Sequence, residues 1–132
     1  MKYLSLSECD SLAKSLAARI NYYFTKPLKI YGHPRGGIST MYLVSKYIVP
    51  PVEFTECVKD CDLIIDDIYD TGKTEKLLSV FNKPIMFLID KRVVPFSEWA
   101  EYVVFPWEDE WKVWRLKRHR SAFSQKIDSD NL

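Results

Sequence analysis

Two adjacent aspartates close an apolar run near the middle of the chain, and a loop rich in hydroxyl groups follows them. The segment reads Leu63-Ile64-Ile65-Asp66-Asp67-Ile68-Tyr69-Asp70-Thr71-Gly72-Lys73-Thr74. Gly72 lets several backbone N–H groups point at one anion, and Thr71 and Thr74 add hydroxyl donors. Carboxylates that end a buried strand are costly to desolvate unless hydroxyl groups or a cation meet them. Ribose hydroxyls or Mg²⁺ would meet Asp66 and Asp67, so the segment predicts a cradle for a ribose 5-phosphate.

The triplet Gly72-Lys73-Thr74 also occurs at the end of loops that bind nucleoside triphosphates. That motif requires a glycine five positions before Gly72. Asp67 stands there, and its carboxylate would repel a triphosphate, so this interpretation is disfavoured. A second alternative involves no ligand: solvated acids end the strand, and a capped helix follows. Any one of these residues alone favours that alternative, whereas the whole pattern favours the cradle.

A second glycine-rich loop follows an apolar segment earlier in the chain. It reads Tyr31-Gly32-His33-Pro34-Arg35-Gly36-Gly37. The Arg35 guanidinium can hold a pyrophosphate with forked, charge-assisted hydrogen bonds. Gly36 and Gly37 expose backbone N–H groups where a helix is expected to begin. The alternative is a common strand-to-helix turn with a solvated arginine, which becomes the weaker interpretation beside the first loop.

Composition fits one domain and narrows the classes of function. The chain has 132 residues, and 47% of them are hydrophobic, which is enough for a single core. Lys plus Arg number 19 and Asp plus Glu number 18, so no overall charge draws the protein to nucleic acid or to a membrane surface. No apolar run suits a signal peptide or a membrane span. Cys9, Cys57 and Cys61 indicate reduced thiols in a cytoplasmic protein rather than a zinc site.

Apolar periodicity and turn residues predict alternating helices and strands. Helices are expected at 7–24, with Ser7 as the N-cap, at 38–48 and at 74–81, and strands at 28–31, 52–58, 62–66, 85–89 and 102–105. The third of these strands has a continuous apolar run and is expected at the centre of the sheet. The alternation predicts an α/β fold, a single-domain doubly wound parallel sheet over residues 1–120, followed by a disordered tail over 121–132. Ligands bind outside the carboxyl ends of such strands, which points to the loops after Tyr31, Ile65 and Ile89.

The segment from Leu63 to Thr74 resembles, at every position, the phosphoribosyl pyrophosphate signature of type I phosphoribosyltransferases. The resemblance implies that Asp66 and Asp67 contact the ribose hydroxyls and Mg²⁺. It implies that Asp70 is the catalytic base that takes the N7 proton of a purine. It also implies a 5′-phosphate site at Asp70, Thr71, Gly72, Lys73 and Thr74.

The loop from 31 to 37 resembles the pyrophosphate loop of the same family. The resemblance implies pyrophosphate contacts from Pro34, Arg35, Gly36 and Gly37. Members of the family often carry a cis peptide in this loop, and the aligned bond here joins Pro34 to Arg35.

Two later segments resemble the base-binding parts of 6-oxopurine phosphoribosyltransferases. Ile89-Asp90-Lys91-Arg92 is similar to a strand end at which a lysine donates to the exocyclic oxygen of the base, and Lys91 matches that lysine. The segment 102–108 is similar to one in xanthine-guanine enzymes that stacks an aromatic ring on the purine, and Trp107 is the matching candidate. The resemblance covers roughly 29–111. It implies a transferase that joins phosphoribosyl pyrophosphate to guanine, xanthine or hypoxanthine with Mg²⁺. We expect the protein to be a homodimer.

Two features keep other functions open. Catalytic members of the family usually carry a long flexible loop before the signature strand, and only 49–61 fills that span, so a nucleotide-binding regulator without turnover is an alternative. Trp107, Trp111 and Trp114 fall at helical spacing, and 112–120 holds five Lys or Arg with no acid. Docking of this helix on the domain or on a second subunit is favoured over a nucleic-acid role.

Overall fold

The computed structural model describes residues 2–93 and 103–108. In chain order the elements are β1 (Lys2–Tyr3), α1 (Leu6–Tyr23), β2 (Leu28–Gly32), α2 (Gly36–Ser45), β3 (Val52–Phe54), the 3₁₀ turn η1 (Val58–Asp60), β4 (Leu63–Tyr69), α3 (Lys73–Leu78), the 3₁₀ turn η2 (Ser79–Phe81), β5 (Ile85–Asp90) and β6 (Val103–Val104). Four strands form a parallel sheet in the order β3-β2-β4-β5, and β1 pairs with β6 in a separate parallel ladder. The predicted α/β fold with a parallel sheet is confirmed.

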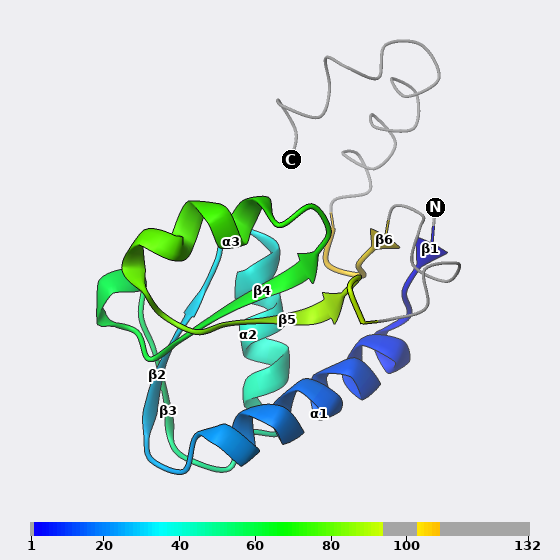
Figure 1. Ribbon diagram of the computed structural model, residues 1–132. Coiled ribbons are helices and arrows are strands. Elements are labelled where there is room, and N and C mark those ends of the chain that lie inside the picture. The colour runs from blue at the N-terminus through cyan, green and yellow to red at the C-terminus, as the bar shows by residue number, and fades with distance from the viewer. Residues whose placement is uncertain (1, 94–102, 109–132) are drawn as a thin grey trace.

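The central strand β4 is apolar on both faces, and each face has its own cover. Leu63 and Ile65 point into the main core, which α1 and α2 complete with residues such as Leu16. Ile64 points the other way and packs with Leu78 at the end of α3. Full burial of each of these side chains contributes roughly 1.5–3 kcal/mol. The sheet therefore lies between α1 and α2 on one side and α3 on the other (Figure 1).

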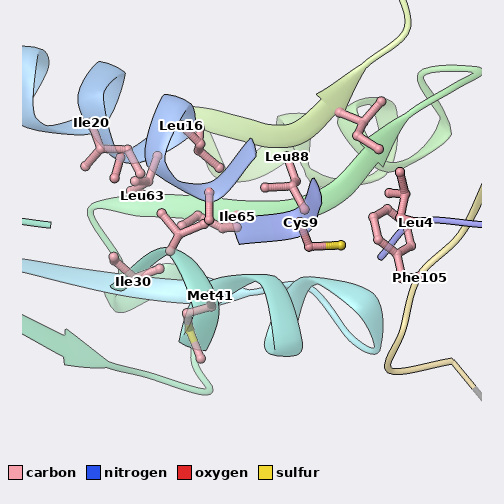
Figure 2. Close-up of a cluster of buried hydrophobic side chains, with 14 of the residues drawn as sticks. Leu4, Cys9, Leu16, Ile20, Ile30, Met41, Leu63, Ile65, Leu88 and Phe105 are labelled. Atoms are coloured by element: carbon pink, nitrogen blue, oxygen red, sulfur yellow. The ribbon is translucent and has the colours of Figure 1, made fainter. Parts of the chain in front are cut away.

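The small β1–β6 ladder extends the main core beyond the carboxyl ends of β4 and β5 (Figure 1). The backbone N–H of Leu4 donates to the carbonyl of Val104 at 3.0 Å and continues the ladder. Figure 2 shows Leu4 and Phe105 in the same cluster of side chains as Cys9 of α1 and Leu88 of β5. Residues from both ends of the described chain therefore share one core with the central sheet.

The start of α1 differs from the prediction. The N-cap is Ser5, and the predicted N-cap at Ser7 is wrong. The Ser5 hydroxyl accepts a hydrogen bond from the Glu8 N–H, and the Glu8 carboxylate accepts one from the Ser5 N–H, each at 3.0 Å. This capping box satisfies two backbone donors at once. Ser7 has Asp10 at the corresponding position, and that carboxylate instead accepts a hydrogen bond from the Tyr47 hydroxyl.

Other element boundaries differ by a few residues. α2 begins at Gly36, inside the predicted turn, and β3 covers only three residues of the predicted strand. β4 continues past Asp66 to Tyr69. The last predicted strand is reduced to two residues, and its partner β1 was not predicted. A two-residue strand carries no period-2 pattern, so nothing local in the sequence marks it.

Two predictions lie outside the described residues. They concern the basic stretch at 112–120, with Trp111 and Trp114, and the tail at 121–132, so the domain boundary at residue 120 stays a prediction. Within 2–93 and 103–108, no helix has the length and apolar character needed to cross a membrane.

Candidate functional site

Three loops meet at the carboxyl ends of the parallel strands. The His33 N–H, after β2, donates to the Ile65 carbonyl of β4 at 2.9 Å. A Cβ atom on Gly37 would lie 2.5 Å from the same carbonyl oxygen, so only glycine fits at this close approach. After β5, the Lys91 N–H donates to the Tyr69 carbonyl at 3.1 Å. The three segments predicted to bind ligand therefore form one continuous edge.

The two aspartates lie on β4 where it passes the loop before α2. Asp66 is 5% exposed, and its Oδ1 accepts a hydrogen bond from the Asp67 N–H at 2.9 Å. Asp67 Oδ1 accepts one from the Ile68 N–H at 2.7 Å. The Asp67 carboxylate lies directly against Gly36, where any Cβ atom would collide with it. An acid of the predicted ribose pair thus borders the predicted pyrophosphate loop.

The pKa of both aspartates is raised. Desolvation is the main cause for Asp67, the neighbouring charge of Asp66 is the second, and together they raise the pKa of Asp67 to about 7. Desolvation also raises the pKa of Asp66, although hydrogen bonds from Asp67 and Thr74 oppose the rise. A buried and a half-buried carboxyl group in contact favour a shared proton until a cation or hydroxyl donors compensate the charge. The pair is suited to meet ribose hydroxyls or a hard cation.

The aspartate pair fits Mg²⁺ only as part of a larger coordination shell. Carboxylate oxygens are ligands that Mg²⁺ prefers, and it requires near-octahedral coordination. In the part of the chain that the structure describes, no group of three or more His, Cys, Asp or Glu side chains is placed to hold a metal ion. A magnesium ion beside Asp66 and Asp67 would therefore take most of its ligands from water and from a bound phosphate compound.

The loop between β4 and α3 curls around a small cavity. Gly72 has φ 83°, in the left-handed region, and directly precedes the first residue of α3. Glycine adopts this conformation without the steric cost that a Cβ atom brings. The cavity has a volume of about 110 Å³ and is lined by Ile68, Tyr69, Asp70, Thr71, Gly72, Lys73, Thr74, Glu75 and Phe87. All five residues predicted for the 5′-phosphate therefore surround one space.

The loop before α2 is built around a cis peptide between Pro34 and Arg35. Arg35 is exposed and occupies the N-cap position of α2. The Gly37 N–H donates to the His33 carbonyl at 2.8 Å, so it does not point outward as the sequence suggested. Burial lowers the pKa of His33, and its Nδ1 has no hydrogen-bond partner among residues 2–93 and 103–108. Of the predicted pyrophosphate set, Pro34 and Arg35 are exposed, Gly36 is half-buried and Gly37 is buried.

Lys91 and Asp70 join the two remaining loops. The Lys91 Nζ lies 3.3 Å from Asp70 Oδ2, and the lysine side chain is 16% exposed while the aspartate is 61% exposed. Lys91 is therefore mostly buried, unlike a surface lysine. A cationic donor beside a carboxylate acceptor is complementary to a ligand that carries an acceptor and a donor on adjacent atoms. The structure brings the predicted base contact and the predicted catalytic base together.

Comparison with solved structures identifies the fold. No family model and no curated protein sequence matches the chain. The structure is similar to a purine phosphoribosyltransferase from Pyrococcus horikoshii Ot3, with a TM-score of 0.58 and 22% identity over 81% of this chain and 93% of that one. It is also similar to a hypoxanthine-guanine phosphoribosyltransferase from Bacillus anthracis, with a TM-score of 0.50 and 22% identity over 83% of each chain. The chain has the type I phosphoribosyltransferase fold. The predicted resemblance is thereby confirmed at the level of the fold.

Within the phosphoribosyltransferase fold, Trp107 belongs to the segment after β6. Its ring stacks on Phe105 with a centroid distance of 4.8 Å and an interplanar angle of 10°. It also packs against the main core. Its Nε1 is buried and has no hydrogen-bond partner in the described segments. These contacts are with the protein itself, so stacking of Trp107 on a base stays a prediction.

Sequence reasoning missed one residue that lines the cavity and a second residue that stacks on it. Tyr69 lines the cavity directly before Asp70, and its ring meets Phe87 edge-on with a centroid distance of 5.2 Å. Arg92 lies over the Tyr69 ring, with its guanidinium carbon 3.7 Å from the ring centre. The sequence does show an aromatic residue, Tyr69, shortly after one predicted strand and a cation, Arg92, shortly after the next. This pair becomes informative only once β4 and β5 are known to be neighbours.

Proposed function

We propose that this protein is a phosphoribosyltransferase that transfers the ribose 5-phosphate group of phosphoribosyl pyrophosphate to a 6-oxopurine base, with release of pyrophosphate. The observation that carries the proposal is the contact between the predicted ribose-binding acids and the predicted pyrophosphate loop, in which the Asp67 carboxylate lies against Gly36. A single ligand with a phosphate at one end and a pyrophosphate at the other has its ribose between them, so it needs the ribose-binding acids next to both loops. Two purine phosphoribosyltransferases with this fold support the choice of substrate class.

The proposed ligand is divided among three sets of residues. The 5′-phosphate binds in the cavity at 70–74, where backbone N–H groups and the Thr71 and Thr74 hydroxyls donate to it. The ribose hydroxyls donate to Asp66 and Asp67. The pyrophosphate binds to Arg35, whose guanidinium forms forked hydrogen bonds with phosphate oxygens, and to the adjoining start of α2.

We also propose that Mg²⁺ binds together with the pyrophosphate group. When bound, Mg²⁺ offsets negative charge on the leaving group. Asp66 and Asp67 would hold it together with oxygens of the ligand. The raised pKa of Asp67 supports this assignment, because a carboxyl pair that binds a proton in the free protein gains a compensating charge in the complex.

The base binds between the loops that follow β4 and β5. Lys91 donates to the exocyclic oxygen of guanine, xanthine or hypoxanthine, and Asp70 accepts the proton of N7. N9 of the base forms a bond to C1′ of the ribose while the bond from C1′ to the pyrophosphate oxygen breaks. The electron pair of that bond leaves with pyrophosphate, and the N7 proton moves to Asp70. The 3.3 Å ion pair between Lys91 and Asp70 supports this arrangement, since both groups are present at one point of the edge.

One titration and one assay test the proposal. Calorimetry with phosphoribosyl pyrophosphate and MgCl₂ is expected to give saturable binding, and an absorbance assay is expected to give turnover with at least one of guanine, xanthine and hypoxanthine. Binding without turnover would make the nucleotide-binding regulator the better function. Absence of binding would contradict both. The homodimer stays a proposal, to be checked by sedimentation.

A further inference from the structure

A cluster at the wall of the phosphate cavity has no role in the function proposed above. It joins Arg92, which follows β5, to Tyr69, the last residue of β4. The guanidinium carbon lies 3.7 Å from the centre of the tyrosine ring, a distance typical of a stacked cation–π contact. The ring also meets Phe87 edge-on at 5.2 Å. Tyr69 is therefore held from two sides.

The position of Arg92 over the ring is fixed by neighbouring acids. Its Nε donates to Asp90 Oδ1 at 2.9 Å and a terminal nitrogen donates to Asp90 Oδ2 at 2.7 Å. The other terminal nitrogen lies 3.9 Å from Glu75 Oε2 on α3. A forked arginine–carboxylate pair sets the plane of the guanidinium as well as its position. Arg92 is thus held in one orientation although its side chain is 51% exposed.

The hydroxyl end of Tyr69 lies beneath the turning point of the phosphate loop. A Cβ atom on Gly72 would come within 2.5 Å of the tyrosine oxygen and 3.1 Å of the ring carbon that bears it. Gly72 is the residue with the left-handed conformation, φ 83°. The ring therefore fills the space directly under the backbone that shapes the cavity, and a change in its tilt would change that backbone.

We propose that Arg92 is a positioning residue: by holding the Tyr69 ring in place, it keeps the loop around Gly72 in the shape that binds a phosphate monoester. We call the contact of Arg92 with the Tyr69 ring the clamp. It also links the predicted phosphate site to the predicted base site, because the Lys91 N–H, next to Arg92, donates to the Tyr69 carbonyl at 3.1 Å. The inference rests on the proposed function for the identity of the ligand. It adds that a residue outside the phosphate-binding set controls phosphate affinity.

Simple attraction between the Arg92 charge and the phosphate is the competing explanation. Arg92→Lys distinguishes this explanation from the positioning role. Lysine keeps the charge but loses both the forked hydrogen bonds to Asp90 and the flat surface that stacks on Tyr69. Lys76→Gln is the matched control for charge, since it removes a cation from an exposed position on the same helix as Glu75. Tyr69→Phe keeps the ring, and Tyr69→Leu removes it.

The test measures binding of inorganic phosphate and of ribose 5-phosphate by calorimetry, with far-UV circular dichroism and Tm to verify folding. Arg92→Lys and Arg92→Gln are each expected to raise the Kd about fivefold, whereas Lys76→Gln is expected to change it by less than about twofold. In the Tyr69→Leu background, Arg92→Lys is expected to have no further effect, since its partner is gone. Tyr69→Phe is expected to retain the effect of Arg92→Lys.

Wild-type affinity in Arg92→Lys, or an equal further loss in the Tyr69→Leu background, would overturn the inference. In a steady-state assay, the clamp predicts a raised KM for phosphoribosyl pyrophosphate with kcat nearly unchanged. The two proposals fail in different ways. If phosphate binding depends on Arg92 but no turnover is seen, the transferase proposal is contradicted and the clamp is supported. If turnover is seen and Arg92→Lys leaves its KM for phosphoribosyl pyrophosphate unchanged, the clamp is contradicted and the transferase proposal is supported.

Discussion

The Asp66–Asp67 carboxyl pair makes a contribution to stability that falls as pH rises, and Asp67→Asn should remove much of this fall. The pKa of Asp67 is raised to about 7 by burial and by the charge of Asp66. The folded protein therefore holds a proton that the unfolded chain releases near pH 4. Stability from this group is fully present below that pH and is lost as pH rises toward 7. Asparagine keeps the shape and can still accept the hydrogen bond from the Ile68 N–H, but it carries no charge.

The size of the effect follows from the change in pKa. A carboxyl group whose pKa rises from 3.8 to about 7 on folding costs up to about 4 kcal/mol once it is ionised. Asp66 shares the proton, and Asp67 is only partly buried, so the measurable part is smaller. We expect the free energy of unfolding of Asp67→Asn, relative to wild type, to increase by about 1–2 kcal/mol between pH 5 and pH 8.

Urea unfolding monitored by circular dichroism at pH 5 and pH 8 measures this difference. Asp60→Asn is the matched control, because it removes the same charge from an exposed position in η1. If the two variants show the same change between the two pH values, the account of the carboxyl pair is wrong. Addition of phosphoribosyl pyrophosphate with MgCl₂ should stabilise wild type at pH 8 and stabilise Asp67→Asn much less, since binding only to the folded state raises its stability.

Three further experiments examine other parts of the molecule. Asp70→Asn is expected to lower kcat by about 10²- to 10⁴-fold in a steady-state assay, with little change in the calorimetric Kd for phosphoribosyl pyrophosphate. If the variant loses affinity but retains kcat, Asp70 is a loop-capping acid and not the catalytic base. Gly72→Val should abolish phosphate binding in a calorimetric titration, because its side chain would meet the Tyr69 hydroxyl, and an unchanged Kd would count against this site. Ser5→Ala should lower the free energy of unfolding by about 1 kcal/mol, whereas Ser7→Ala should have almost no effect; equal losses would contradict the observed capping box.

The central features of the fold were predictable because their signals are local. The continuous apolar run at 63–65 marks a strand covered on both faces, and it lies at the centre of the sheet. The glycine of the phosphate loop occupies the position that needs a left-handed backbone. The rule that ligands bind at the carboxyl ends of parallel strands then brought the three loops together before any contact between them was known.

Contacts between distant segments could not be predicted in the same way. The closeness of Gly36 to Asp67 depends on the register of β2 against β4. The stacking of Arg92 on Tyr69 depends on β4 and β5 being neighbours with their ends aligned. The cis state of the Pro34–Arg35 peptide was left open, since a sequence does not distinguish the two isomers. Each of these features is a property of tertiary arrangement rather than of local pattern.

The β1–β6 ladder has a consequence for how the molecule assembles. It pairs Lys2 with Val103, segments separated by about 100 residues. Because loop-closure entropy must be overcome before such a contact gives any stability, the ladder is expected to form after the sheet and its helices. During synthesis, β1 has no partner until Val103 and Val104 have emerged. We therefore expect β6, the strand before Trp107, to be the last part of the described core to fold, after the loops around the cavity have formed.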